Sequence, residues 1–395
     1  MQKPKKSICI ISFSPIYRDA RVLRQIKYLS PFYHLTVIGY GEPHPRWNNV
    51  NTIDWNVVKI PERSVLSIAI EAVQLAFGRF KISFFEKWYW TKRHHRTAFE
   101  MAISIKCDAY HANDWEALPV AAEAARKVNA PIVFDAHEYA PLELENRWYW
   151  RFFKPAIIYF IHKYAPQVKF SITVASLISD RYKKEFGLDP TVILNAPEFT
   201  PTPWSKDIDF NNIRLIHHGG AIKDRKLEKM IRILPLCDPR YSLHFMLISN
   251  GAKYLKDLKK LANELAPGRV TFNEPVPPEE VVHRISEYDI GIYLLEHNNY
   301  NNTVALPNKF FDFIAAGLVV CIGPSPSMAE ILQKYGCGVV VPSFNSHDVA
   351  KTLNQLTIEQ LAIMRQASRK AIEDMNAEKE MSKLLDLYTR LFNPN

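Results

Sequence analysis

The chain has 395 residues, about two to three times the length of an ordinary domain, which favours two domains over one. Hydrophobic residues make up 47% and charged residues 23% of the sequence, a balance typical of globular proteins and not of disordered ones. The five cysteines are scattered and include no Cys-x-x-Cys pair. This argues against a disulfide framework and a structural zinc site, and favours a reducing cytosol.

The first apolar run of the chain predicts a buried strand. It spans residues 8–13 and follows a basic tail with three lysines within residues 3–6. Because the run is short, meets Ser12 and Ser14 and lacks a small-residue cleavage site, we interpret it as a strand and not as a signal peptide. No apolar run of the sequence reaches the roughly eighteen residues that a membrane-spanning helix needs. We therefore expect a cytoplasmic protein.

Short β-branched runs alternate with helical patterns, such as residues 21–29, through the first half of the chain. Continuous apolar strands that alternate with helices predict a parallel sheet covered by helices on both faces. Seven strands are expected, at residues 8–13, 35–40, 57–60, 109–112, 132–136, 172–175 and 192–195.

Most of the net charge of +9 lies in residues 1–200, which hold 27 basic and 19 acidic residues, whereas residues 201–395 hold 23 and 22. Two segments of the first half, 79–106 and 147–154, interleave basic with aromatic side chains. This composition suits an anionic membrane surface, where rings lie among the headgroups and cations meet phosphates. A helix with an aromatic core face and a solvated basic face has the same composition. We expect peripheral contact with the inner face of the plasma membrane through both segments. No nucleic-acid partner is expected, because no nucleic-acid motif is recognisable.

Polar clusters follow three predicted strands of the first half. They are residues 14–21 after the first strand, 111–115 after the fourth and 135–139 after the fifth. In a doubly wound sheet, ligands bind beyond the carboxyl ends of the strands, so we expect these clusters at one functional edge. A single His or Asp in such a place more often caps a helix. The clusters contain no Gly-x-Ser-x-Gly elbow, and the spacing of the histidines fits no familiar metal site.

A polar, Pro-rich segment then separates two domains of similar pattern. The predicted boundaries are 1–198 for the first domain, 199–212 for the linker and 213–376 for the second domain. A final helical segment, 377–395, follows another helix without an intervening strand, and we expect it to cross back onto the first domain. Strands of the second domain are expected at residues 213–217, 243–248, 270–272, 290–295, 319–322 and 339–341. The fold class is thus predicted as α/β, with two doubly wound domains and a cleft between them.

Two segments of the second domain are suited to bind a diphosphate. After its first strand come Gly219 and Gly220, whose backbone N–H groups could approach an anion, although a Gly-Gly pair by itself is more often a tight turn. The segment 305–317 is more specific. Its Pro307 suits a first helical turn, and Lys309 would lie near the helix N-terminus, where anions bind. The alternative is an amphipathic helix with a solvated Lys309.

With these motifs, the sequence resembles the retaining GT-B glycosyltransferases of family 4, the bacterial group 1 enzymes, particularly those that make surface polysaccharides. The matching segments are spread along nearly the whole chain and occur in the same order as in those enzymes. The most specific matches are Leu-Pro-Asn-Lys-Phe-Phe-Asp at 306–312 and Asp-Ala-His-Glu at 135–138. The other matching segments are 14–29, 111–122, 192–197, 219–231 and the rest of 305–320.

The resemblance implies two Rossmann-like domains, the second holding a nucleotide-sugar donor and the first an acceptor. It implies that Arg225 and Lys309 hold the donor diphosphate, that Asp312 binds the ribose and that His137 contacts the donor sugar near the reacting carbon. The catalytic residues expected are His137, Arg225 and Lys309. The donor-binding residues expected are Gly219, Gly220, Arg225, Val276, Pro307, Asn308, Lys309 and Asp312. The acceptor-binding residues expected are Arg18, Asp19, Arg21 and Asp114.

The sequence departs from the pattern of those enzymes at two places. Gly220 stands where many of them have an arginine, and a pair of glutamates eight residues apart is replaced by Val304 and Asp312. Asn301 or Asn302 is a candidate for the missing contact to the sugar. The departures leave the nucleotide and the sugar undefined.

The resemblance implies transfer of a sugar, with retention, to a hydroxyl of a lipid-linked or polysaccharide acceptor in cell-surface glycan synthesis. No metal or other cofactor is expected, because cations would stabilise the departing diphosphate, which can itself accept the acceptor's proton. Two alternatives stay open. A sugar-nucleotide 2-epimerase would need no acceptor, and an inactive scaffold of a glycan-assembly complex would turn over nothing.

Overall fold

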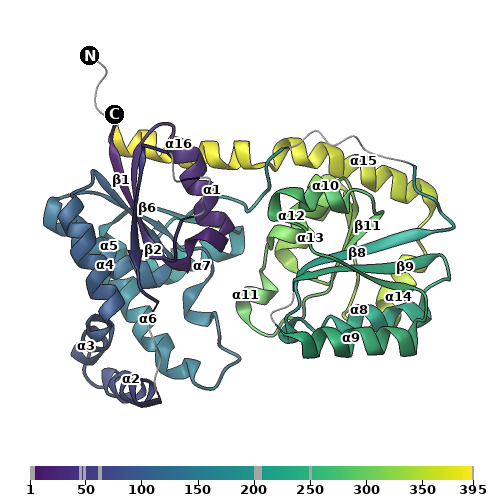
Figure 1. Ribbon diagram of the computed structural model, residues 1–395, viewed down its shortest axis with the longest axis horizontal. Helices are drawn as coiled ribbons and strands as arrows, with labels where there is room; N and C mark the ends of the chain where they lie inside the picture. Colours follow the sequence, from purple (N-terminus) through teal and green to yellow (C-terminus); the bar gives the residue numbers. More distant parts are fainter. Residues whose placement is uncertain are drawn as a thin grey trace. The chain divides into compact units, whose positions relative to one another are not determined.

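The computed structural model describes residues 5–43, 47, 50–60, 65–199, 207–248 and 251–393, without the side chains of 65–69, 72 and 252. The chain forms two compact units, each a parallel sheet flanked by helices (Figure 1). The first comprises Met1–Ile193, Asn299–Asn301 and Met381–Asn395, and the second comprises Leu194–Asn298 and Asn302–Glu380. Residues 200–206 of the predicted linker, with Pro201 and Pro203, lie outside the described residues.

The first unit is built on a sheet whose described strands run in the order β3-β2-β1-β4-β5-β6-β7, all parallel. Its strands are β1 Ser7–Pro15, β2 His34–Tyr40, β3 Ile53–Val58, β4 Ala109–Asn113, β5 Ile132–Asp135, β6 Val168–Thr173 and β7 Thr191–Val192. Its helices are α1 Ala20–Leu29, α2 Val65–Gly78, α3 Ser83–Thr91, α4 Arg93–Ile105, α5 Asp114–Val128, α6 Trp150–Tyr164 and α7 Ser176–Phe186. Short 3-10 turns are η1 Ile16–Arg18, η3 Ala140–Leu142 and η4 Ala165–Gln167.

The sequence pattern of each strand reflects its place in this sheet. Ile8–Ile11 of the central strand β1 are fully buried, because helices cover both faces, and this strand was predicted closely. The edge strand β3 is buried only at its two end residues, Ile53 and Val58, and carries the polar residues Asp54 and Asn56. Its prediction at 57–60 was therefore displaced from the observed Ile53–Val58.

The second unit is built on a sheet whose described strands run in the order β10-β9-β8-β11-β12-β13, again all parallel. Its strands are β8 Ile213–Gly220, β9 Tyr241–Ile248, β10 Val270–Asn273, β11 Ile290–Tyr293, β12 Val319–Ile322 and β13 Gly338–Val340. Its helices and turns are η5 Lys223–Arg225, α8 Glu228–Ile233, η6 Leu234–Leu236, α9 Ala252–Leu265, η7 Pro278–Glu280, α10 Val281–Ile285, α12 Asn308–Ala315, α13 Pro326–Tyr335, α14 Ser346–Asn354 and α15 Ile358–Asp374.

Of the helices that the structure describes, two contain residues of both units. In α11 (Tyr300–Thr303), Tyr300 and Asn301 belong to the first unit. In α16 (Ala377–Phe392), residues from Met381 onward belong to the first unit, and Leu384, Leu387 and Tyr388 pack into its core. The Tyr388 hydroxyl lies 2.7 Å from Nδ1 of the buried His111 in β4.

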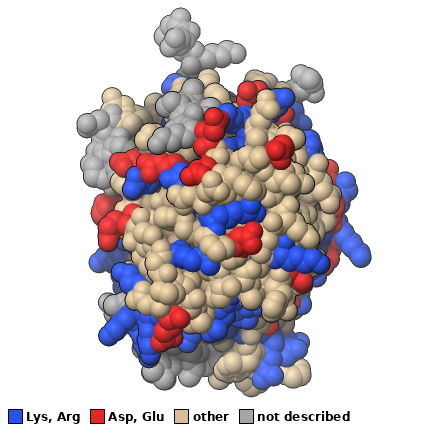
Figure 2. Space-filling model, turned by 90° about the vertical axis from the view of Figure 1, so that its right-hand side faces the viewer, with Lys and Arg blue, Asp and Glu red and all other residues tan. Residues whose placement is uncertain are grey.

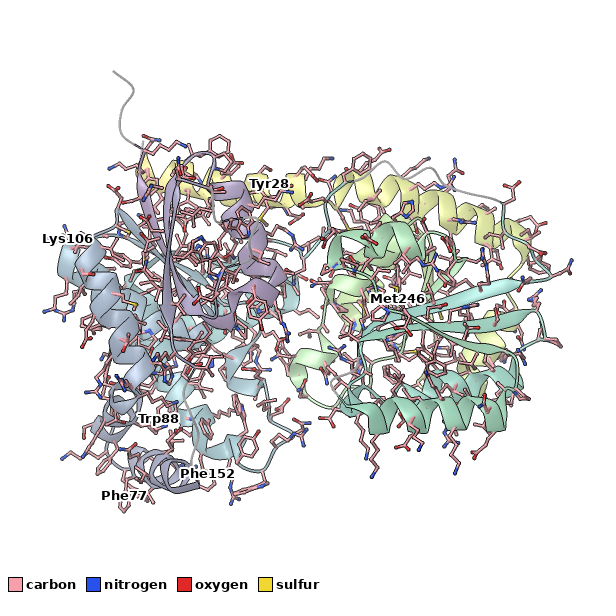
Figure 3. The ribbon with its side chains drawn as sticks, in the orientation of Figure 1. Tyr28, Phe77, Trp88, Lys106, Phe152 and Met246 are labelled. Atoms are coloured by element: carbon pink, nitrogen blue, oxygen red, sulfur yellow. The ribbon has the colours of Figure 1, made fainter. Side chains whose placement is uncertain are left out.

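The surfaces and cores agree with the composition. On the face of the second unit drawn in Figure 2, basic and acidic side chains are interspersed, in line with the near-neutral charge of residues 201–395. Trp88 of α3 lies inside the first unit and Met246 of β9 inside the second (Figure 3). The five cysteines are buried free thiols. Among the helices described, none is both long enough and apolar enough to cross a bilayer.

Candidate functional site

In the second unit, the end of β8 lies against the start of α12. Gly219 has a φ of +107°, which disfavours residues with a side chain, and a Cβ at this position would lie 3.2 Å from the Lys309 Nζ. At Gly220 a Cβ would lie 3.8 Å from Arg225 Nη1. Helix α12 approaches the sheet closely because Gly291 of β11 leaves room for the Phe313 ring. The structure therefore brings together the glycine loop and the two cations that the sequence predicted.

The Lys309 ammonium is buried beside an imidazole and a phenol ring. Its side chain is 6% exposed, its Nζ lies 3.3 Å from His217 Nε2 and it lies 5.0 Å from the centre of the Tyr293 ring. Burial and the charge of Arg225 hold the pKa of Lys309 well below its usual range, against the opposing effect of Asp312. An anion bound beside Lys309 would favour its charged form.

His217 holds Lys309 in place, and the sequence analysis missed it. The Nδ1 of His217 lies 2.9 Å from the carbonyl oxygen of Ile292, which can only accept, so Nδ1 carries the proton and Nε2 presents a lone pair to Lys309. Burial and the charge of Lys309 keep the pKa of His217 well below its usual value, so the ring is neutral. The only sequence signal was the pair of histidines before Gly219.

Asp312, the predicted ribose ligand, lies one turn beyond Lys309, with Oδ2 3.4 Å from His218 Nε2. Burial and the charge of Lys309 lower the pKa of His218 to about 3, so this imidazole is neutral at ordinary pH. Pro307 precedes α12 as its N-cap, and Asn308 is exposed at the first position of the helix. Val276 is half-buried in the loop after the edge strand β10, and its predicted contact with the base stays a prediction.

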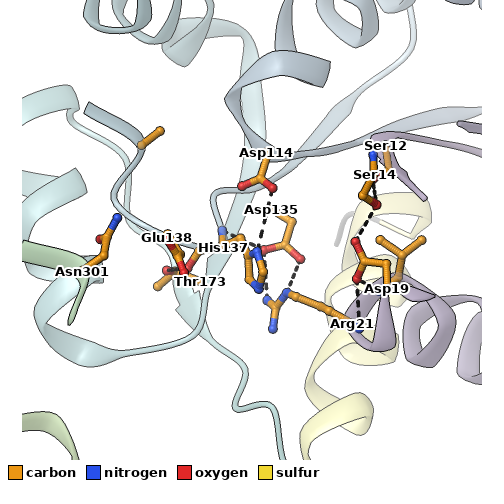
Figure 4. A network of polar contacts seen from close by, with 12 residues as sticks. Ser12, Ser14, Asp19, Arg21, Asp114, Asp135, His137, Glu138, Thr173 and Asn301 are labelled. Atoms are coloured by element: carbon orange, nitrogen blue, oxygen red, sulfur yellow. Dashed lines mark hydrogen bonds and ion pairs between the residues drawn. The ribbon is translucent and has the colours of Figure 1, made fainter. Parts of the chain in front are cut away.

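In the first unit, His137 and Asp114 face each other at the ends of β5 and β4, as Figure 4 shows. Their Nδ1 and Oδ2 atoms are 3.8 Å apart, and both residues have left-handed backbones, with φ of 47° and 64°. Burial would lower the pKa of His137, but the Asp114 carboxylate outweighs it and raises the pKa to about 9. The imidazole is therefore a cation at neutral pH.

Asp135 lies beside this pair and bonds the backbone of His137 (Figure 4). Its carboxylate accepts hydrogen bonds from Arg21 Nε and Nη2 at 2.6 and 2.9 Å, from Gln25 Nε2 at 2.6 Å and from the backbone N–H of His137 at 3.1 Å. Burial would raise the pKa of Asp135, but the charge of Arg21 outweighs it and lowers the pKa. Arg21, predicted as an acceptor ligand, is buried in this ion pair, so it orients the loop that carries His137.

The other predicted acceptor residues lie on the segment between β1 and α1. Asp19 is the N-cap of α1, accepting hydrogen bonds from the backbone of Arg21 and Val22, and it also accepts one from Ser14 Oγ at 2.6 Å. Arg18 is exposed, and its guanidinium lies 5.0 Å from the centre of the Tyr17 ring. Their roles toward an acceptor stay predictions.

The sequence analysis did not name Glu143, and the structure gives Asn301 a different contact from the one expected. Burial, together with the charges of Asp114 and Glu138, raises the pKa of Glu143 to about 8, so an uncharged carboxyl group lies near His137. Asn301, a candidate for the missing sugar contact, instead bonds the backbone of Tyr139 through both amide atoms, at 3.0 and 3.2 Å. Val304, which replaces a glutamate, is buried.

Three residues of the first unit have the composition of a metal site. One ligand atom each from His94, His95 and Glu116 lies within 4.8 Å of the others. The Nδ1 of His95 bonds the Tyr89 carbonyl at 3.0 Å, and its Nε2 lies 2.9 Å from Glu116 Oε1. The charge of Lys92 acts on both Glu116 and His95 and opposes a second cation there. The prediction that no metal is needed stays a prediction.

Comparison of the sequence with known proteins gives one short match. No model of a known protein family matches the chain. A segment of 120 residues is 32% identical to TuaH of Bacillus subtilis (strain 168), whose name assigns it to teichuronic acid biosynthesis as a glycosyltransferase. The match covers 29% of this chain and 28% of TuaH, so the chain aligns with little more than a quarter of that protein.

Solved structures match nearly the whole chain at low sequence identity. Alr3699/HepE of Anabaena in complex with UDP-glucose has a TM-score of 0.70 and 15% identity, over 97% of this chain and 99% of that one. A glycosyltransferase of Rickettsia africae ESF-5 has a TM-score of 0.68 and 11% identity, over 100% of both chains. Sucrose-phosphate synthase of Thermosynechococcus elongatus has a TM-score of 0.69 and 12% identity, over 98% and 99%. The two parallel-sheet units thus have the fold of the GT-B glycosyltransferases, as the sequence predicted.

Proposed function

We propose that this chain is a glycosyltransferase that moves a sugar from a UDP-sugar to a hydroxyl group of a glycan acceptor. One observation carries the proposal: the buried Lys309 ammonium lies against Gly219 at the N-terminus of α12, with Arg225 close enough to depress its pKa. A buried cation beside backbone N–H groups is suited to a diphosphate. The UDP-glucose complex of HepE and the name of TuaH support the choice of reaction and nucleotide.

In this proposal the second unit stabilises the leaving group. As the bond between the anomeric carbon and the diphosphate oxygen breaks, negative charge grows on that oxygen. Lys309, Arg225 and the N–H groups that begin α12 are the groups that would oppose this charge, an effect that is often the largest single contribution to catalysis. Asp312 would accept hydrogen bonds from the ribose hydroxyls, and Gly219 and Gly220 would let the diphosphate approach the backbone.

The first unit supplies the groups proposed to act on the sugars. The protonated His137 would donate a hydrogen bond to the donor sugar near the reacting carbon, with Asp114 keeping it charged. Asp114 and the exposed Arg18 would contact the acceptor. Asp19 and Arg21 would act on the acceptor through the loop geometry that they fix, because both side chains hold other groups.

The finer points of the proposal follow from the resemblance in the sequence. We propose that the anomeric configuration is retained, as in family 4 enzymes, and that the departing diphosphate accepts the acceptor's proton without a metal ion. The acceptor is proposed to be lipid-linked or a polysaccharide of the cell surface, extended on the cytoplasmic side of an anionic membrane.

The proposal predicts that turnover of a UDP-sugar depends on Lys309. Lys309→Ala should lower kcat by about ten- to a thousandfold, because a donor to the developing charge is lost. Release of UDP in the presence of a membrane-derived glycan acceptor is the measurement, with circular dichroism to check folding. The matched control is Lys256→Ala, which removes an exposed lysine of α9 and should leave kcat unchanged.

Equal turnover by a folded Lys309→Ala variant would overturn the assignment of the site. Conversion of the UDP-sugar to an epimer without any acceptor would instead identify a 2-epimerase. A wild-type chain that neither binds UDP nor releases it would be an inactive scaffold.

A further inference from the structure

Helix α2 carries an exposed apolar face. Ile70, Val73 and Phe77 are each more than half exposed, and their spacing of three and four residues places them on one side of the helix. Leu75 is fully buried on another side. A surface helix normally turns its large apolar side chains inward, so these three need a partner other than water.

The turn after α2 continues this face. Phe80 is 89% exposed and Ile82 is more than half exposed, and the exposed cations Arg79 and Lys81 alternate with them. The Phe77 ring contacts Phe84 at the start of α3, with centroids 5.5 Å apart, which ties the turn to the helix. Apolar tips and cations therefore point outward within one short segment.

A second segment adds to the face from the start of α6, a helix that packs against α2. Trp148 is 74% exposed and Tyr149 is exposed, and they are flanked by the exposed cations Arg147 and Arg151. Phe77 and Phe152 lie at the same end of the first unit, whereas Trp88 lies further inside (Figure 3). We call residues 70–82 and 147–151 together the docking face.

This surface corrects the one expected from the sequence. Phe85, Trp88 and Tyr89 of the predicted segment 79–106 are buried, so these three rings of α3 form core, and we assign residues 79–82 of that segment to the face. Two of the nearby acidic groups have cationic partners. Glu86 bonds Lys163 at 2.6 Å, and Glu71 lies 3.7 Å from Lys92.

We propose that the docking face inserts its apolar side chains among the headgroups of an anionic phospholipid bilayer, with its arginines and lysine on the lipid phosphates. Cations interleaved with aromatic and aliphatic tips fit the mixed apolar and anionic layer of such a surface. The inference is independent of the proposed function, because it concerns membrane binding and not the donor site.

The test is cosedimentation of the full chain with vesicles of phosphatidylcholine alone or mixed with phosphatidylglycerol. We expect binding to the mixed vesicles, weakened by salt. Phe77→Ser with Phe80→Ser should reduce the partition coefficient by at least about tenfold, since two aromatic rings that the bilayer would bury are lost. Arg79→Glu with Lys81→Glu should reduce it at least as much, because each cation contributes about fivefold.

The controls change similar residues elsewhere. Phe32→Ser and Ile363→Ser replace exposed apolar residues outside the face, and Lys256→Glu with Lys260→Glu reverses two exposed lysines of α9. These controls should bind vesicles as the wild-type chain does, and all variants should bind UDP alike. Equal vesicle binding by the docking-face variants, or equal binding of neutral and anionic vesicles, would overturn the proposal. So would a wild-type dimer in sedimentation velocity that only the docking-face variants dissociate, because the face would then bind a second copy.

Discussion

The charge of His137 depends on one neighbour, and its position depends on another. Asp114 raises its pKa to about 9, whereas Asp135 accepts its backbone N–H at 3.1 Å. Left-handed backbone at His137 and Asp114 costs of order 1 kcal/mol for each residue and persists only when the surroundings enforce it. The buried pair of Arg21 with Asp135 provides that enforcement. Charge and geometry at this residue can therefore be changed separately.

Asp114→Asn should remove the charge effect and keep the shape. A histidine whose pKa is raised on folding stabilises the native state fully below its unfolded pKa, about 6.5, and loses this contribution as the pH rises through about 9. The wild-type free energy of unfolding should accordingly fall over this window, and the Asp114→Asn variant should lose that dependence. Urea unfolding at several pH values, with NMR titration of the His137 imidazole, is the measurement. An imidazole pKa that is the same in both proteins would contradict the assignment.

His217 should act on the donor only through Lys309. His217→Phe keeps a ring beside Tyr293 but removes the lone pair that accepts from Nζ, an interaction of about 1 kcal/mol or more. We expect the KM for the UDP-sugar to rise about fivefold or more and the pH profile of kcat/KM to shift. The exposed His347→Phe of α14 is the control. An unchanged pH profile with only lower stability would mean that His217 is structural.

At the scale of elements, the start of α1 shows how a predicted ligand can be a structural residue. Asp19 accepts from two backbone N–H groups, each at 3.1 Å, at the helix N-terminus, where loss of a cap costs about 1 kcal/mol. Its carboxylate also accepts a hydrogen bond from the Ser14 hydroxyl, and this bond holds the loop after β1. Capping of the helix and contact with an acceptor are thus two separate roles for the Asp19 side chain, and a substitution can distinguish them.

Asp19→Ala should lower the free energy of unfolding by about 1 kcal/mol, and Asp19→Ser should restore most of it, because serine also caps helices. Urea unfolding measures this loss, and kcat/KM for the acceptor measures the second role. Restored stability together with restored activity in Asp19→Ser would assign Asp19 to the cap alone. A stable Asp19→Ser variant with a much higher KM for the acceptor would show that Asp19 contacts the acceptor directly.

The elements that the sequence predicted best are those whose pattern is set by burial on both sides, such as 319–322, which the structure shows as β12. The approach of Lys309 to Gly219 was also predictable, because the carboxyl ends of parallel strands share one edge of a sheet. The bond of Arg21 to Asp135 spans 114 residues, and no local pattern encodes such a pairing. The apolar face of α2 was missed for a related reason, since composition alone does not tell which side of a helix is covered.

At the scale of the whole molecule, charge and chemistry divide between the two halves of the chain. Residues 1–200 hold most of the excess positive charge and include the docking face, while the second unit, with Lys309 and Arg225, has almost no net charge. Anion binding in the second unit therefore depends on local placement of cations and backbone N–H groups. Membrane binding by the first unit depends on its overall positive charge, so salt should weaken membrane binding more than it weakens anion binding in the second unit.

The most direct test of the central claim is calorimetric titration of UDP into the wild-type chain and into Lys309→Ala, Arg225→Ala and Lys256→Ala. The account predicts that UDP binds the wild-type chain and Lys256→Ala equally. Binding to Lys309→Ala and Arg225→Ala should be at least about tenfold weaker, because each loses a charged hydrogen bond to the diphosphate. The same affinity in all four proteins would contradict it.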